Sequence, residues 1–173
     1  MILECCVGIQ AQADPPSEYQ LKAVFLFNFV KFVDWPADAF RKDAPIRICV
    51  IGNDPFGVSL DHIVQDKIIS DRQLVIFRST RSEDVAGCHL VFLAGSDAGR
   101  ISAVFEKLKG SSTLIVGESQ NFALSGGTIQ FFLEDNKVRF YINIDAAQRA
   151  RLKVSSKLLA LAKVVHDDSE KGN

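Results

Sequence analysis

The chain has 173 residues, with 47% hydrophobic and 24% charged residues and a formal net charge of −1. This is the composition of an ordinary globular protein, most simply a single domain that can bury a sizeable core unaided. The balanced charge and the scattered Lys and Arg residues argue against nucleic-acid binding, which needs a basic face, and against a polybasic membrane patch.

The first thirteen residues differ from the rest and end in Ala11-Gln12-Ala13, a small-x-small pattern of the kind that signal peptidase cleaves. They lack a basic start and carry Glu4 among apolar residues. We interpret residues 1–13 as the remnant of a signal peptide; a disordered cytosolic N-terminus is the alternative. If the chain is exported, the mature protein keeps Cys49 and Cys88, and such an even pair suggests a disulfide.

Residues 18–36 predict a helix of about five turns, with Ser17 as its N-cap and a proline as its stop. Lys22 and Lys31 point in opposite directions, so every face of the helix is rich in Phe, Val, Leu or Ala. A helix of this kind must be covered all round. Its cover is either the protein's own core or a partner or second subunit, while the two lysines argue against a membrane.

Residues 46–51 predict a buried strand, followed by a turn and a helix that begins with Asp54 as its N-cap. An amphipathic helix is expected from Asp97 to Gly110. Strands that alternate with helices in this way indicate a parallel sheet that is covered on both faces. The other strands of this kind are expected at 74–77, 89–94 and 113–116.

The pattern changes after residue 127. Strands at 128–133 and 138–144 are joined by a tight turn and predict an antiparallel hairpin. In the second strand apolar residues alternate with Arg139, Tyr141 and Asn143, so one face is expected to be wet or functional. A last helix is expected over 152–165, before a disordered tail at 167–173.

Together these patterns predict an α/β fold with three layers and Rossmann-like connections. Its mostly parallel sheet has about six strands and a C-terminal antiparallel hairpin, with helices on both faces. Residues 14–166 are expected to form a single domain.

The residues that carry chemistry form no recognisable active site. Residues 52–57 lie where a Rossmann-like fold binds phosphate, but they lack the glycine spacing of that motif and fit a structural turn better. The three histidines show no metal-ligand spacing, and no serine or cysteine has the context of a nucleophile. We therefore expect no enzyme, no metal and no cofactor.

Two blocks of the chain resemble the YfiR-like family of small exported bacterial proteins. Residues 18–36 read E-Y-x-x-K-A-x-F-L-x-N-F-x-K-F-x-x-W-P, and residues 142–162 read I-N-I-D-A-A-x-x-A-x-L-x-x-S-S-x-L-L-x-L-A. Two middle blocks, at 51–57 and 125–131, occur in the same order as in the family. The resemblance covers residues 18–165.

The resemblance implies a periplasmic regulator that dimerises and represses a membrane-bound diguanylate cyclase by binding its periplasmic domain. The resemblance also implies that redox or envelope stress relieves this repression and raises cyclic di-GMP. Cys49 and Cys88 match the position and spacing of one cysteine pair of the family's type member. Its second pair, in the segment corresponding to about 123–130, is missing, because Ala123 and Gln130 stand there.

Two functions therefore compete. The leading hypothesis is a homodimeric interaction protein that binds a membrane sensor. The second is a sensor for a nucleotide or amino acid, bound at the carboxyl ends of the strands near Asn53, Ser96 and Gly117. A hydrolase is disfavoured for want of a nucleophile–base pair. The predicted partner or dimer interface consists of Phe25, Phe29, Phe32, Trp35, Leu158 and Leu161.

Overall fold

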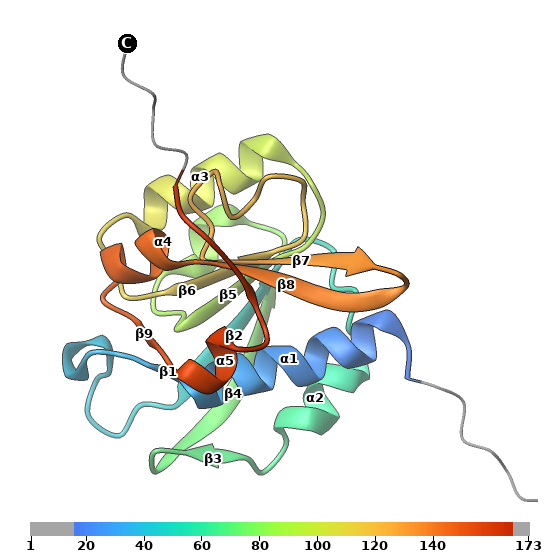
Figure 1. Cartoon of the computed structure of the whole chain (residues 1–173). Coiled ribbons are helices and arrows are strands. Elements are labelled where there is room, and N and C mark those ends of the chain that lie inside the picture. The colour runs from blue at the N-terminus through green and yellow to red at the C-terminus, as the bar shows by residue number, and fades with distance from the viewer. Residues whose placement is uncertain (1–15, 168–173) are drawn as a thin grey trace, which may run out of the picture.

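The protein has three layers, with a central sheet between two layers of helices (Figure 1). The structure is a computed structural model that describes residues 16–167, so the expectations for residues 1–13 and for the end of the tail lie outside it. The helices α1 (Glu18–Phe32), α2 (Val58–Val64) and α5 (Ser156–Leu159) cover one face, and α3 (Ala98–Leu108) and α4 (Ile144–Arg149) cover the other.

The central sheet has eight strands and is mostly parallel. In chain order they are β2 (Ile46–Ile51), β3 (Ile68–Ile69), β4 (Arg72–Ser79), β5 (Leu90–Leu93), β6 (Leu114–Gly117), β7 (Ile129–Glu134), β8 (Lys137–Asn143) and β10 (Lys163–Val165). Their spatial order is β10-β8-β7-β6-β5-β2-β4-β3. The strands from β7 to β4 in this order run parallel, whereas β8 and β3 are antiparallel to their neighbours β7 and β4.

This order makes the sheet a doubly wound one. β2 comes first among the parallel strands and lies between β4 and β5, so the chain reverses its direction of winding at the boundary between β2 and β5. In such sheets the carboxyl ends at this switch point form a crevice where ligands commonly bind. The prediction of a mostly parallel α/β sheet with helices on both faces is confirmed, with more strands than the six expected.

α1 packs its inner face on the antiparallel half of the sheet. Phe29 lies at the centre of this contact, with its ring centroid 5.5 Å from that of Phe131 in β7 and 5.1 Å from that of Phe140 in β8. As predicted, Ser17 caps the helix, and it forms a reciprocal capping box with Gln20. The helix is not covered all round, because Leu21, among others, is exposed on its outer side. Within residues 16–167, no helix has both the length and the apolar character needed to cross a bilayer.

The predicted helix over 152–165 is wrong. This segment instead forms β9 (Lys153–Val154), the short helix α5 and the edge strand β10. β9 pairs with β1 (Val33–Asp34), which continues the chain directly after α1, and β10 pairs with the open edge of β8. The apolar residues of this segment fit a helical period, but backbone pairing with two available strands determines the structure.

The start of α2 also differs from the prediction. Asp54 does not cap the helix, because its carboxylate accepts a hydrogen bond from the backbone N–H of Phe56 (2.8 Å) and pairs with Arg78 (2.6 Å). The helix begins four residues later, after Gly57, whose φ of 52° favours glycine. Residues 52–57 therefore form a turn, as the sequence indicated.

Candidate functional site

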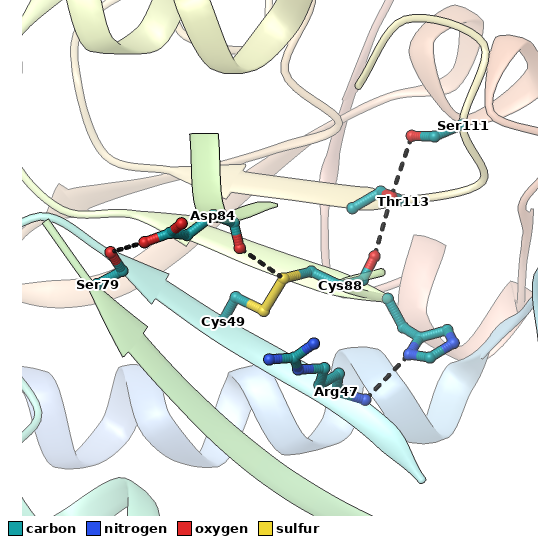
Figure 2. Close-up of a disulfide and its surroundings, with 8 residues drawn as sticks. Arg47, Cys49, Ser79, Asp84, Cys88, Ser111 and Thr113 are labelled. Carbon is teal, nitrogen blue, oxygen red and sulfur yellow. Dashed lines mark hydrogen bonds between the residues drawn. A yellow bond between two sulfur atoms is a disulfide. The ribbon is translucent and has the colours of Figure 1, made fainter. Parts of the chain in front are cut away.

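The two cysteines of the described chain form a disulfide, as predicted (Figure 2). Cys49 lies in β2 and Cys88 directly precedes His89 and β5, with 6.0 Å between their Cα atoms. Both residues are buried in the apolar core that β2 and β5 share with α3. The Thr113 hydroxyl donates a hydrogen bond to the carbonyl of Cys88 (3.0 Å), which ties this end of β5 to the start of β6. The bridge thus fixes the segment before β5 to the middle of the sheet.

His89 follows the disulfide and is itself buried. Its Nδ1 accepts a hydrogen bond from the backbone N–H of Arg47 (3.0 Å), and its Nε2 lies 3.3 Å from the carbonyl oxygen of Ala39. Because the Arg47 N–H can only donate, Nδ1 is the unprotonated nitrogen and Nε2 carries the hydrogen. The ring also stacks on Phe40, with 4.6 Å between centroids. Burial lowers the pKa of His89, and the charges of Arg72 and Arg47 act in the same direction.

The predicted ligand residues lie at the carboxyl ends of their strands. Asn53 and Ser96 follow β2 and β5 at the switch point and are both exposed. Gly117 ends β6 and is buried. The ring of Phe122 packs so closely on it that a Cβ at this position would lie 2.5 Å from the ring. Ser96 lines a cavity of about 400 Å³ with Phe122 and several hydroxyl groups, whereas Asn53 is not among its lining residues. The structure therefore does not unite these residues in one cavity, and a ligand there stays a prediction.

A buried lysine with two carboxylates lies near the carboxyl end of β6, and the sequence analysis missed it. The side chain of Lys22 in α1 is only 4% exposed, and its Nζ lies 2.6 Å from Glu118 and also pairs with Glu18. The Tyr19 hydroxyl donates to the other oxygen of Glu118 (3.1 Å). Burial acts to lower the pKa of Lys22, but the bonds and charges of the two carboxylates outweigh it and raise that pKa. The cluster anchors α1 to the sheet.

The residues predicted at a partner interface fall into three groups. Phe29 and Leu158 are completely covered by the protein's own core, so neither presents a surface to a partner. Leu161, after α5, is 65% exposed. The remaining three are half-buried and pack against the core from its edge: Phe25, Phe32 and Trp35. The interface itself stays a prediction, without its two buried members.

The exposed apolar side chains nearest to this set lie on α1 and around α5, which are in contact (Figure 1). We define the α1/α5 surface as Leu21, Val24, Phe25, Phe32 and Leu161. Leu21, Val24 and Leu161 are exposed, and Phe25 and Phe32 are half-buried.

Comparisons with known proteins relate the sequence to a family model and the fold to solved structures. A family model described as YfiR/HmsC-like matches residues 19–163, which confirms the resemblance carried by the opening and closing blocks. Among solved structures, the conserved domain protein from Vibrio cholerae O1 biovar El Tor str. N16961 is similar, with a TM-score of 0.57 and 14% sequence identity over 86% of this chain.

A second similar structure is the ABC domain in complex with L-Trp from Streptococcus pneumonia, with a TM-score of 0.56 and 10% identity over 85% of this chain. This chain spans 60% of each of these two longer chains. At such low identities the similarities show a shared fold.

Proposed function

The chain belongs to the YfiR/HmsC-like family, and on that premise we propose that it is a non-enzymatic regulatory protein of the periplasm. It binds and represses a membrane-anchored diguanylate cyclase or a similar sensor, and so controls cyclic di-GMP signalling. The observation that carries this proposal is the family match over residues 19–163. The buried Cys49–Cys88 bridge supports an oxidising compartment, because disulfides of this kind are rare in reducing ones.

The α1/α5 surface supports a protein partner. Exposed aliphatic side chains gathered on neighbouring elements are typical of interaction sites rather than of a free surface. Lys31 and Lys157 are exposed beside them and form no ion pair with any residue in 16–167. We infer that the partner presents an apolar groove with an acidic rim, provided by the periplasmic part of the sensor. A homodimer of this chain is part of the same proposal.

The test is repression in the native host, with the cognate cyclase intact. Deleting the gene is expected to raise cyclic di-GMP, and the wild-type gene is expected to restore the low level. Val24→Glu and Leu161→Glu, which place a charge on the α1/α5 surface, are expected to fold but to fail in restoring it. Ile68→Glu is the matched control, because Ile68 is as exposed as Leu161 but lies in β3, at the edge of the sheet opposite to β10.

Each arm answers a separate question. No rise in cyclic di-GMP after deletion contradicts repression of a cyclase. Full restoration by Leu161→Glu and Val24→Glu contradicts the α1/α5 surface as the partner site but leaves repression standing. The three variants are purified from periplasmic extracts. Circular dichroism and thermal melting then establish that all three are folded.

A further inference from the structure

A cavity of about 350 Å³ lies on the face of the sheet opposite α1, where β7, β8 and β10 run side by side. Because side chains alternate along a strand and Phe131 faces α1, its neighbours Gln130 and Phe132 face the other way. Tyr141 of β8 reaches the same face. The loop between β6 and β7 lines another side of the cavity, through Leu124 and neighbouring residues.

Gln130 carries an unused pair of hydrogen-bond donors on the wall of this cavity. The residue is only 9% exposed, and its Oε1 accepts a hydrogen bond from the backbone N–H of Ala123 (3.0 Å). This bond fixes the orientation of the amide, because a backbone N–H needs an acceptor. The Nε2 group is therefore left as a donor, and none of residues 16–167 accepts a hydrogen bond from it.

The neighbouring buried amide shows the contrast. Asn143 is 0% exposed, but its Oδ1 accepts from the N–H of Ala146 (3.0 Å), and its Nδ2 donates to Ala123 (2.7 Å) and Asp167 (2.8 Å). Asn143 is thus saturated by the protein, whereas Gln130 is not. Nε2 of Gln130 is not among the fully buried atoms without a partner in residues 16–167, so it reaches the open space of the cavity, where the acceptor of a ligand can form a hydrogen bond with it.

The rest of the wall combines an apolar part with two polar side chains, Gln120 and Asn121. The rings of Phe132 and Tyr141 stack at 4.3 Å with an interplanar angle of 23°, and Leu124 and Val165 line the cavity beside them. No carboxylate is among its lining residues, so an acceptor oxygen meets no repulsion from within the wall. The volume lies near the lower end of the range for small-molecule sites, which suits one or two rings.

We propose that this cavity binds a small planar ring compound with a carbonyl oxygen. The carbonyl oxygen accepts a hydrogen bond from Nε2 of Gln130, and the ring packs against Phe132 and Tyr141. The Ser96 cavity offers rotatable hydroxyl groups but no buried amide with free donors. The site lies on the face away from the α1/α5 surface, so the inference does not depend on the proposed partner.

The probe for this site is benzamide, titrated into the full chain with its disulfide intact and followed by NMR. We expect saturable shifts of the Gln130 side-chain amide and of Ala123, with a dissociation constant in the millimolar range. Intermolecular NOEs are expected between the Gln130 amide protons and the probe. Benzylamine, which keeps the ring but at neutral pH is protonated and so has no acceptor, is expected to bind about tenfold more weakly.

Gln130→Glu tests the donor itself, because the glutamate still accepts from Ala123 but has no amide hydrogens when ionised. At a pH well above the usual carboxyl range, it is expected to weaken benzamide at least about tenfold. Gln73→Glu is the matched control on an exposed strand position of β4 and should change nothing. Absence of saturable shifts, NOEs located elsewhere, or equal binding by benzylamine or Gln130→Glu overturns the proposal. If Gln130→Glu does not fold, the NOEs between benzamide and the wild-type protein decide by themselves whether the proposed site is correct.

Discussion

The side-chain oxygen of Gln130 lies 3.0 Å from the backbone nitrogen of Ala123 and accepts a hydrogen bond from it. The resemblance to YfiR-like proteins places a second cysteine pair in about this segment, and this chain has neither cysteine. In this chain, the hydrogen bond between Ala123 and Gln130 lies in that region instead. Asn143 strengthens it by donating to the carbonyl of Ala123 (2.7 Å). The loop between β6 and β7 is therefore held by hydrogen bonds that reduction does not affect.

Gln130→Ala is expected to lower the free energy of unfolding by about 1–2 kcal/mol, because it leaves the buried N–H of Ala123 without an acceptor. Denaturant unfolding measures this change, and hydrogen exchange at the Ala123 amide reports it locally. Gln73→Ala, at an exposed strand position, should stay within about 0.5 kcal/mol of the wild type. Unchanged stability and unchanged exchange in Gln130→Ala would show that this hydrogen bond does not hold the loop.

Glu118→Gln is expected to lower the free energy of unfolding by roughly 2–4 kcal/mol, because it removes the more buried of the two carboxylates that pair with a buried ammonium group. Glu18→Gln should cost less, since Glu18 is the more exposed of the two carboxylates. Adding Lys22→Met to Glu118→Gln should recover much of the loss, because the unpaired charge is then gone. Chemical denaturation of the wild type and the three variants measures these differences. Equal losses in both single variants would contradict the dominant role of Glu118.

The fold could be predicted where local patterns and tertiary structure agree. The buried strand at 46–51 and the helix capped by Asp97 both match, because continuous apolar runs and an N-cap are local features. The structure of residues 152–165 could not be predicted, because it depends on open strand edges that only the folded sheet provides. Similarly, the sequence marks Phe29 and Leu158 as apolar but not which surface buries them.

The candidate sites divide in the same way. The even cysteine count pointed to the disulfide, and the alternation around Tyr141 indicated a face of β8 outside the core, where the cavity lies. The pairing of Lys22 with Glu118 joins residues 96 positions apart and leaves no local pattern. The donors of Gln130 are likewise visible only once its partner Ala123 is known.

Reducing the Cys49–Cys88 bridge is expected to lower the free energy of unfolding by about 2–4 kcal/mol, since the bridge closes a loop of 39 residues. Both cysteines are buried, so a reductant should act slowly on the native protein and quickly on the protein in denaturant. Thermal melting with and without reductant measures the loss, and alkylation followed by mass spectrometry confirms the redox state. Rapid reduction of the native protein, or an unchanged melting temperature after complete reduction, would contradict a buried structural role.

The stability of the protein is expected to depend on pH through His89. Burial holds the pKa of this residue below its ordinary value, about 6.5 in the unfolded chain. Above that value both states are neutral and His89 adds no pH dependence. As the pH falls below it, the unfolded chain takes up a proton that the folded protein resists, so stability declines by at most about 1.4 kcal/mol per pH unit until the folded pKa is reached. Protonation of Nδ1 would also remove the acceptor of the Arg47 N–H.

His89→Asn isolates this effect, because its side-chain oxygen can still accept from Arg47 but does not titrate. Melting temperatures measured from about pH 8 to about pH 5 should decline less steeply in His89→Asn than in the wild type. His62→Asn, at an exposed position, should keep the wild-type slope. The carboxylates with lowered pKa, such as Asp97, lose their contribution only at more acidic pH, so they do not mask the result. Identical slopes for His89→Asn and the wild type would show that His89 does not set the pH dependence.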